Sequence, residues 1–290
     1  MHPSARSCTI AAFALLALAS SHPLGAADAT TAPTTAATAT AAVDPVAASP
    51  WASAHGHDQY GDWADLTELG VVQRFRFIPA GTFTMGGGDL WFTPHAVTLT
   101  KPYWMADSSC TQALWQVVMG SNPSKFTGDP QRPVEQVSWD DCQQLLAALN
   151  QRDGRLSARL PTEAEWEYAC RAGTTGQLPG LSLDALAWYR DNSGGTTHPV
   201  KLKEPNSWGL YDMIGNVFQW CGDWFGDFPA DPVTDPVGAA SGSLRVVRGG
   251  SWFMMPALCR STFHAGKEPG SRTSLIGFRI CLPVHMGPNP

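Results

Sequence analysis

Residues 159–174 read RLPTEAEWEYACRAGT, and the clearest local signal of the chain lies here. Thr162 and Glu165 form a Thr-x-x-Glu capping box, in which each side chain bonds the backbone N–H of the other residue. This pairing predicts a helix over the following residues, EAEWEYAC. The capping box and a solvated helix face explain Glu163, Glu165 and Glu167 more simply than acid–base catalysis does.

Two further helices and four strand-like segments flank this stretch. Thr111 precedes QALWQVVM, and Ser138 precedes WDDCQQLLAALN with Asp141 as the acidic partner of the cap. Short apolar patterning between Gly and Pro residues indicates strands in RFRFIPAGTFTMG (74–86), HAVTLTKPYWMAD (95–107), RVVRGGSW (245–252) and GFRICLP (277–283). The pattern predicts an α+β domain with little regular secondary structure. Within it, Arg248 and Arg279 are expected to bond loop carbonyls or carboxylates.

The N-terminal quarter differs in composition from the rest. Residues 1–27 contain one cation, Arg6, then an apolar run and small residues, which is the layout of a secretory signal peptide. Residues 28–50 are almost entirely Ala, Thr, Pro and Val and predict a flexible linker. We assign residues 51–70 to a lead-in and 71–290 to one domain. No membrane span is expected once the signal peptide is removed.

The net charge of −6, with scattered Lys and Arg, excludes the basic stripe that would follow a phosphate backbone. We therefore expect no nucleic acid partner. The chain has seven cysteines, and loss of the signal peptide would remove Cys8. The remaining six allow fifteen disulfide connectivities.

Eight sequence blocks, taken in order, resemble the formylglycine-generating-enzyme (sulfatase-modifying factor) family. They extend from about Phe77 to Leu282 and read FIPAGTFTMGG, CTQALWQVVMGSNPSKF, RPVEQVSWDD, RLPTEAEWEYACRAGT, PNSWGLYDMIGNVFQW, RVVRGGSW, CRS and GFR. The resemblance implies a variant of the C-type-lectin-like fold. It does not by itself imply the reaction, because relatives include copper-dependent oxidases, iron-dependent sulfoxide synthases and binding proteins without chemistry.

The copper site of the family has no counterpart here. In the family, two cysteines shortly after Gly-Gly-Ser bind Cu(I) as thiolates, since soft sulfur suits Cu(I). Residues 248–259 read RGGSWFMMPALC, so the first cysteine position falls at Met254 and the second is missing. We therefore do not expect copper. The thioethers of Met254 and Met255 could also bind Cu(I), but adjacent Met residues more often fill gaps in packing.

The resemblance also suggests a substrate cleft. Ser251 matches a serine near the reacting cysteine of the family, so it is a candidate for contact with substrate or oxygen. A loop serine that hydrogen-bonds its neighbours is the alternative. Phe218 takes the place of an aromatic residue that lines the family cleft, and Trp252, Met254 and Met255 are expected to lie along the same cleft.

Residues 211–220, YDMIGNVFQW, resemble the calcium-binding loop of the family. The resemblance places the ligands at the side chains of Asp212 and Gln219 and at the backbone carbonyls of Gly215 and Val217. Ca²⁺ accepts carboxylate, amide and backbone oxygens. A structural turn without metal is the alternative.

The resemblance implies a disulfide between Cys170 and Cys259. A second pair, Cys142 with Cys281, is suggested by a similar bridge of the family, although its cysteines there are shifted along helix and strand. Cys110 with Cys221 would be a third pair. Each of these pairings assumes an oxidising compartment.

Two classes of function remain open. The first is a periplasmic or secreted oxidoreductase or modifying factor without the Cu(I)-dithiolate mechanism, acting on an unknown protein, peptide or small molecule. The second is a non-catalytic, lectin-like binding module that presents residues 252–258 to a partner, or an accessory protein of the envelope or of secretion. A set of ionisable or metal-binding side chains that converge in the cleft would favour the enzyme over the binding module.

Overall fold

The computed structural model describes residues 44, 49–87 and 93–285. The expected signal peptide at 1–27, and most of the expected linker at 28–50, lie outside the described residues. Among the described helices, none has the length and apolar character needed to cross a membrane.

Helices begin where the capping residues predict them. Thr111 caps α1 (Gln112–Met119), while Ser138 and Thr162 form capping boxes with Asp141 and Glu165 at the starts of α2 (Trp139–Arg152) and α3 (Glu163–Arg171). A short helix, α4 (Leu183–Leu186), and a 3₁₀ turn, η1 (Pro256–Leu258), complete the helical part. These findings confirm the three predicted helices.

One sheet has five strands in the order β1-β2-β3-β6-β12. Its strands are β1 (Ala54–Asp58), β2 (Gly61–Glu68), β3 (Val71–Ile78), β6 (Tyr103–Ala106) and β12 (Cys281–Pro283), all paired antiparallel. The expected lead-in at 51–70 thus supplies β1 and β2 of this sheet. β2 belongs there because Ala64 and Leu66 are buried in the core, and Asp65 pairs with Arg74 of β3.

Two smaller sheets complete the domain. One has the order β10-β9-β7-β11, and the other β4-β5-β8. Their strands are β4 (Gly81–Met85), β5 (His95–Leu99), β7 (Phe218–Trp224), β8 (Val233–Thr234), β9 (Arg245–Arg248), β10 (His264–Lys267) and β11 (Ile276–Phe278).

Three of the four predicted strand segments are each split between two sheets. RFRFIPAGTFTMG supplies β3 and β4, HAVTLTKPYWMAD supplies β5 and β6, and GFRICLP contributes to β11 and β12. Pro79 and Pro102 stand at two of these breaks, where proline lacks the N–H that would continue a ladder. Because each of these segments runs through two sheets, the three sheets belong to one α+β domain.

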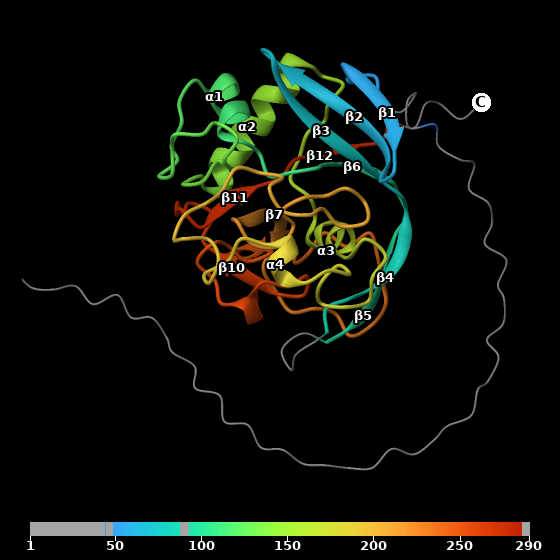
Figure 1. Cartoon of the computed structure of the whole chain (residues 1–290). Helices are drawn as coiled ribbons and strands as arrows, with labels where there is room; N and C mark the ends of the chain where they lie inside the picture. The colour runs from blue at the N-terminus through green and yellow to red at the C-terminus, as the bar shows by residue number, and fades with distance from the viewer. Residues whose placement is uncertain (1–43, 45–48, 88–92, 286–290) are drawn as a thin grey trace, which may run out of the picture. The chain divides into compact units, whose positions relative to one another are not determined.

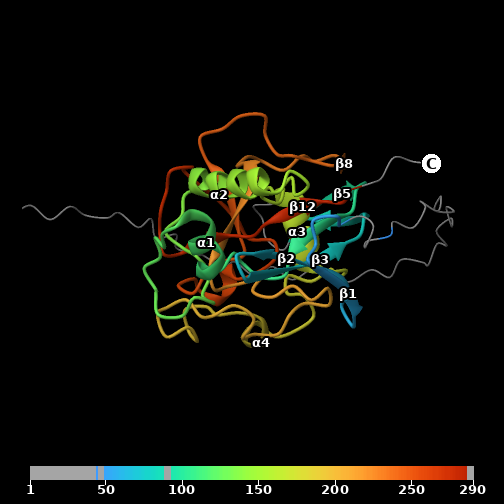
Figure 2. The ribbon, with the colours of Figure 1, turned by 90° about the horizontal axis from the view of Figure 1, so that it is seen from above.

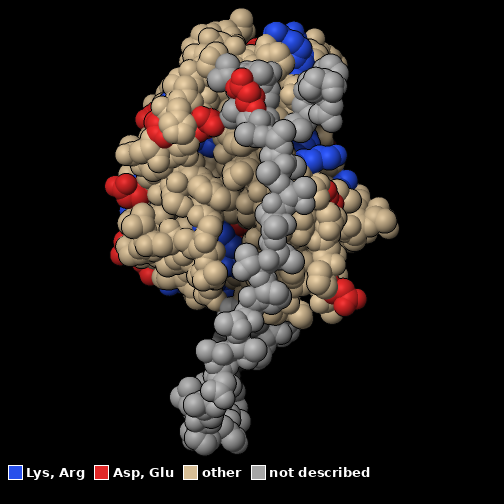
Figure 3. Space-filling model, turned by 90° about the vertical axis from the view of Figure 1, so that its right-hand side faces the viewer, with Lys and Arg blue, Asp and Glu red and all other residues tan. Residues whose placement is uncertain are grey.

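Buried side chains form two core clusters. The first packs the five-stranded sheet against α1 and α2, and the second surrounds α3. α3 contacts β4, β7 and β9, so it lies between the two smaller sheets (Figures 1 and 2). On the face shown in Figure 3, acidic and basic side chains are scattered among uncharged ones.

Candidate functional site

The segment after β9 begins with two glycines that the backbone requires. Gly249 and Gly250 have φ values of 92° and 79°. A Cβ on Gly249 would lie 2.5 Å from the Met213 carbonyl oxygen, and one on Gly250 would lie 2.8 Å from Cys259 Sγ. Glycine tolerates both the positive φ and the close approach. The chain therefore turns into the core before it reaches Ser251.

Ser251 is fully buried. Its backbone oxygen accepts a hydrogen bond from Met254 N, and its Oγ has no hydrogen-bond partner among the described residues. A buried hydroxyl cannot contact a substrate in this conformation. Contact between Ser251 and a substrate would require residues 252–258 to move.

The other cleft candidates differ in their exposure to solvent. Phe218 and Trp252 are buried, Met254 is partly buried against both core clusters, and Met255 is 49% exposed. Phe253, which is not among the predicted cleft residues, is 54% exposed. Phe253 and Met255 therefore form an apolar tip on the segment 252–258, which we call the apolar loop.

The apolar loop is held firmly at its base. Trp252 donates from Nε1 to the Ser274 oxygen at 2.8 Å and packs edge-on against Phe126 at 5.2 Å between ring centroids. Arg190 N donates to the Met254 oxygen at 3.0 Å. Residues 256–258 form the turn η1, whose N–H groups bond back within the loop. The exposed side chains thus project from a fixed backbone.

A buried ionic network lies beneath this loop. Arg248 donates to Glu163 at 3.0 Å and to Glu167, and Glu167 also pairs with Arg171. His264 Nδ1 lies 2.8 Å from Glu163. Burial raises the pKa of Glu163, but Arg248 and His264 outweigh it, so this pKa lies below its ordinary value. The network gives the fully buried Arg248 the counter-charges that such a cation needs.

This network confirms the expected role of Arg248 and corrects the interpretation of the α3 carboxylates. Glu165 does complete the capping box, but Glu163 and Glu167 are buried and do not form a solvated face. Their four-residue spacing places them on one side of the helix, and in the folded domain this side faces the buried Arg248.

The predicted calcium loop offers only part of its expected ligand set. Gln219 Oε1 accepts from Trp166 Nε1 at 2.8 Å and from Arg279 Nε at 3.0 Å, while Gln219 Nε2 donates to the Asp212 backbone oxygen at 2.8 Å. Both ring and guanidinium nitrogens can only donate, so they fix the orientation of the amide. Gln219 therefore has no free side-chain oxygen for a cation, and it does not fit as a calcium ligand in this geometry.

Asp212 fits better. It is buried with a left-handed φ of 50°, its Oδ2 accepts from Lys201 N at 2.9 Å, and its Oδ1 has no partner among the described residues. Burial raises the pKa of this carboxyl. Arg279, which also donates to the backbone oxygens of Ala106 and Tyr211, bonds carbonyls as the sequence predicts. Calcium binding at Asp212, Gly215 and Val217 stays a prediction.

All six cysteines in the described part of the chain are free and buried. Burial raises the pKa of Cys170 and of Cys259 to about 12, and it raises the pKa of the other four thiols as well. Because the thiolate is the nucleophile and the metal ligand, these thiols are poorly suited to either role. Within the described residues, no group of three or more His, Cys, Asp or Glu side chains could hold a metal ion.

Comparison with known proteins finds one matching family model and several sequence relatives. Residues 67–283 match the model of the sulfatase-modifying factor enzyme 1-like domain. A formylglycine-generating enzyme of Streptomyces coelicolor is 34% identical over 199 residues, which cover 61% of this chain and 60% of that protein. Chaperone protein LppX of Paenibacillus barcinonensis is 31% identical over 209 residues, which cover 54% of this chain and 71% of that protein.

Two solved structures have similar folds. Treponema denticola variable protein 1 superimposes with a TM-score of 0.73 at 33% identity, covering 76% of this chain and 99% of that chain. PvdO from Pseudomonas aeruginosa gives a TM-score of 0.63 at 26% identity, covering 80% of this chain and 98% of that chain.

Proposed function

The chain belongs to the family of the sulfatase-modifying factor enzyme 1-like domain, and from this premise we propose that it is a binding member of the family that holds apolar segments of other polypeptides. The fold is the expected C-type-lectin-like variant. One observation carries the proposal. On either side of Met254, where the resemblance expects the first copper-binding thiolate, the chain exposes Phe253 and Met255, and it keeps its described thiols buried.

The apolar loop has the physical properties of a contact surface. Because Phe253 is 54% exposed and Met255 is 49% exposed, covering each of them contributes about half of the roughly 1.5–3 kcal/mol that full burial of such a side chain gives. Met is unbranched and adapts to irregular partners, whereas the anchored Trp252 keeps the backbone in place. A fixed backbone loses little conformational entropy on binding. Two projecting apolar side chains on a rigid base therefore favour a partner that offers its own apolar side chains.

Other observations support a polypeptide partner and an exported protein. A relative named a chaperone protein matches over more than half of this chain, and the apolar N-terminal run at residues 9–19 supports export to the periplasm or beyond. We place the protein there as part of the proposal.

Binding can be measured with an unfolded model polypeptide. Reduced, carboxymethylated lactalbumin exposes apolar side chains and carries a fluorescent label for anisotropy measurements. We expect the double variant F253S/M255S to bind it about tenfold more weakly than the wild type does, a loss of about 1.4 kcal/mol. Leu202→Ser is the matched control, because Leu202 is 60% exposed but lies outside the apolar loop. Equal binding by the wild type and the double variant would contradict the proposal.

An oxidoreductase or modifying factor is the second candidate, supported by 34% identity to a protein named formylglycine-generating enzyme. The chain spans 60% of that relative. Incubation with a sulfatase CxPxR peptide and copper separates the two candidates. We expect no aldehyde product by mass spectrometry, because the thiolate pair is missing, whereas product above a no-enzyme control would favour the enzyme.

A further inference from the structure

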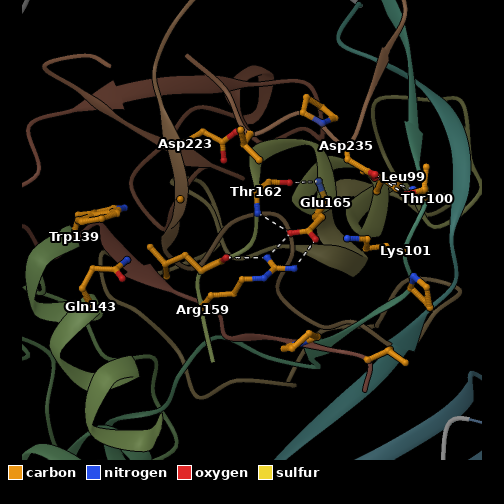
Figure 4. Close-up of a pocket in the computed structure, with 17 residues that line it drawn as sticks. Leu99, Thr100, Lys101, Trp139, Gln143, Arg159, Thr162, Glu165, Asp223 and Asp235 are labelled. Atoms are coloured by element: carbon orange, nitrogen blue, oxygen red, sulfur yellow. Dashed lines mark hydrogen bonds and ion pairs between the residues drawn. The ribbon is translucent and has the colours of Figure 1, made fainter. Parts of the chain in front are cut away.

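A pocket of about 690 Å³ lies apart from the apolar loop. Its walls come from the start of α2, the start of α3, the link between β5 and β6, the segment after β8, the C-terminal strand and β7, which contributes Gly222 and the buried carboxyl group of Asp223. None of its lining residues belongs to the segment 252–258. Figure 4 shows Trp139 and Gln143 at one end and Lys101, Thr100 and Asp235 at the other.

Trp139 gives the pocket a fixed aromatic wall. Its Nε1 donates to the Cys221 oxygen at 2.9 Å, and the Arg245 guanidinium lies 3.9 Å from the ring centroid. Trp139 lines the pocket and Arg245 does not, so the guanidinium supports the indole from outside the cavity. Leu, Val and Pro side chains supply seven of the other sixteen lining residues, and the rest are mainly polar or charged.

The polar groups of the pocket have both signs of charge and largely satisfy one another. Arg159 donates to both oxygens of Glu165 at 2.6 Å, and Asp235 accepts from the backbone N of Thr100 at 2.7 Å and from its hydroxyl. Lys101 adds another positive charge close by. With cations and carboxylates mixed along one wall, neither an anion nor a cation is favoured.

We propose that this pocket binds a neutral carbohydrate of one or two sugar rings. The aliphatic C–H face of a sugar packs against the indole of Trp139, and its hydroxyls, which both donate and accept, bond the mixed polar wall. The Gln143 amide beside Trp139 supplies a donor and an acceptor together. A mostly apolar cavity with a few placed polar groups is the usual form of a small-molecule site. This binding is independent of the apolar loop.

The test uses the full chain with cellobiose, maltose and N,N′-diacetylchitobiose as probes, and isothermal titration calorimetry as the readout. We expect at least one disaccharide to bind, and Gln143→Ala to weaken that binding about tenfold. Gln144→Ala is the matched control, because Gln144 is the exposed neighbour on the same helix and lies outside the pocket. Alanine is favourable in a helix interior, so both variants should fold.

Trp139→Leu should also abolish sugar binding, whereas F253S/M255S should leave it unchanged. The proposal is overturned if none of the three disaccharides binds, if Gln143→Ala binds as tightly as Gln144→Ala, or if only a short peptide such as tetra-alanine occupies the pocket. Failure of sugar binding leaves the lactalbumin measurement unaffected, so this inference and the proposed function can fail separately.

Discussion

Asp223 is deeply buried and lies close to a second carboxylate, that of Glu163. It lies on β7, is 3% exposed, and its Oδ2 accepts from Glu163 N at 2.8 Å. Burial raises its pKa to about 7, and the Glu163 carboxylate adds to the effect. Because the folded-state pKa lies above the ordinary aspartate value, this group favours folding below about pH 4, and that contribution is lost as the pH rises through 7.

Asp223→Asn should therefore remove a pH-dependent part of the stability. The amide keeps an oxygen for the Glu163 N–H but does not titrate. Relative to the wild type, the free energy of unfolding of the variant should rise between pH 5 and pH 8, by about 2.5 kcal/mol for a shift of this size. Urea denaturation of both proteins across this range measures the difference. A difference that stays constant with pH would show that Asp223 does not titrate there.

Single residues were predictable where a local rule fixes them. The caps Thr111, Ser138 and Thr162 follow from short-range patterns, and all three form. The burial of Glu163 was not predictable in this way, since its partner Arg248 is far along the chain and meets it only in the folded domain. Burial of Ser251 likewise depends on the backbone turn at the preceding glycines.

At the scale of elements, Gln219 links the loop 211–219 to distant parts of the fold. Gln219 joins Trp166 of α3, Arg279 and the Asp212 backbone through three hydrogen bonds. These bonds connect the loop to α3 and to the residue that follows β11. Asp212 keeps its unpartnered Oδ1, so one further oxygen at position 219 would create a pair of carboxylates.

Gln219→Glu should therefore make the protein more responsive to calcium. The new carboxylate replaces Nε2 near Asp212, so repulsion should lower the melting temperature in chelator, and Ca²⁺ should raise it again by binding both groups. We expect the increase on adding calcium to be larger in Gln219→Glu than in the wild type, by thermal melting. Adding Asp212→Ala to the variant is the control and should remove the increase. A calcium-induced increase in the variant that is no larger than in the wild type would contradict this prediction.

Strand segments were predictable as apolar runs but not in their pairing. Each of 74–86 and 95–107 looks like one continuous segment, yet each divides between two sheets. Local patterning indicates which residues are apolar, whereas the choice of sheet depends on contacts with distant strands. For the same reason the sequence does not show that residues 51–70 add two strands to this sheet, with β1 paired to β2 and β2 paired to β3.

Across the whole domain, the cysteines are divided between the two core clusters. Cys110 and Cys142 belong to the cluster of α1 and α2, and the other four belong to the cluster around α3. The predicted pair Cys170 and Cys259 thus shares one cluster, whereas Cys142 and Cys281 do not. Disulfide geometry requires Cα atoms within about 7 Å, which is easier to satisfy inside one cluster.

Oxidation should therefore join Cys170 to Cys259 and leave Cys142 and Cys281 unpaired with each other. The bridge closes a loop of about 90 residues and should stabilise the fold by about 4 kcal/mol on the chain-entropy model. Non-reducing peptide mapping after mild oxidation identifies the bridge, and urea denaturation with and without reductant measures its effect. The Cys170→Ser variant serves as the control and should show no stabilisation on oxidation.

In the reduced native protein, all six described thiols should resist iodoacetamide at pH 8 and become labelled only on unfolding, because burial raises every thiol pKa. Rapid labelling of native Cys259 would contradict its burial, and a mapped Cys142–Cys281 bridge would contradict the predicted pairing.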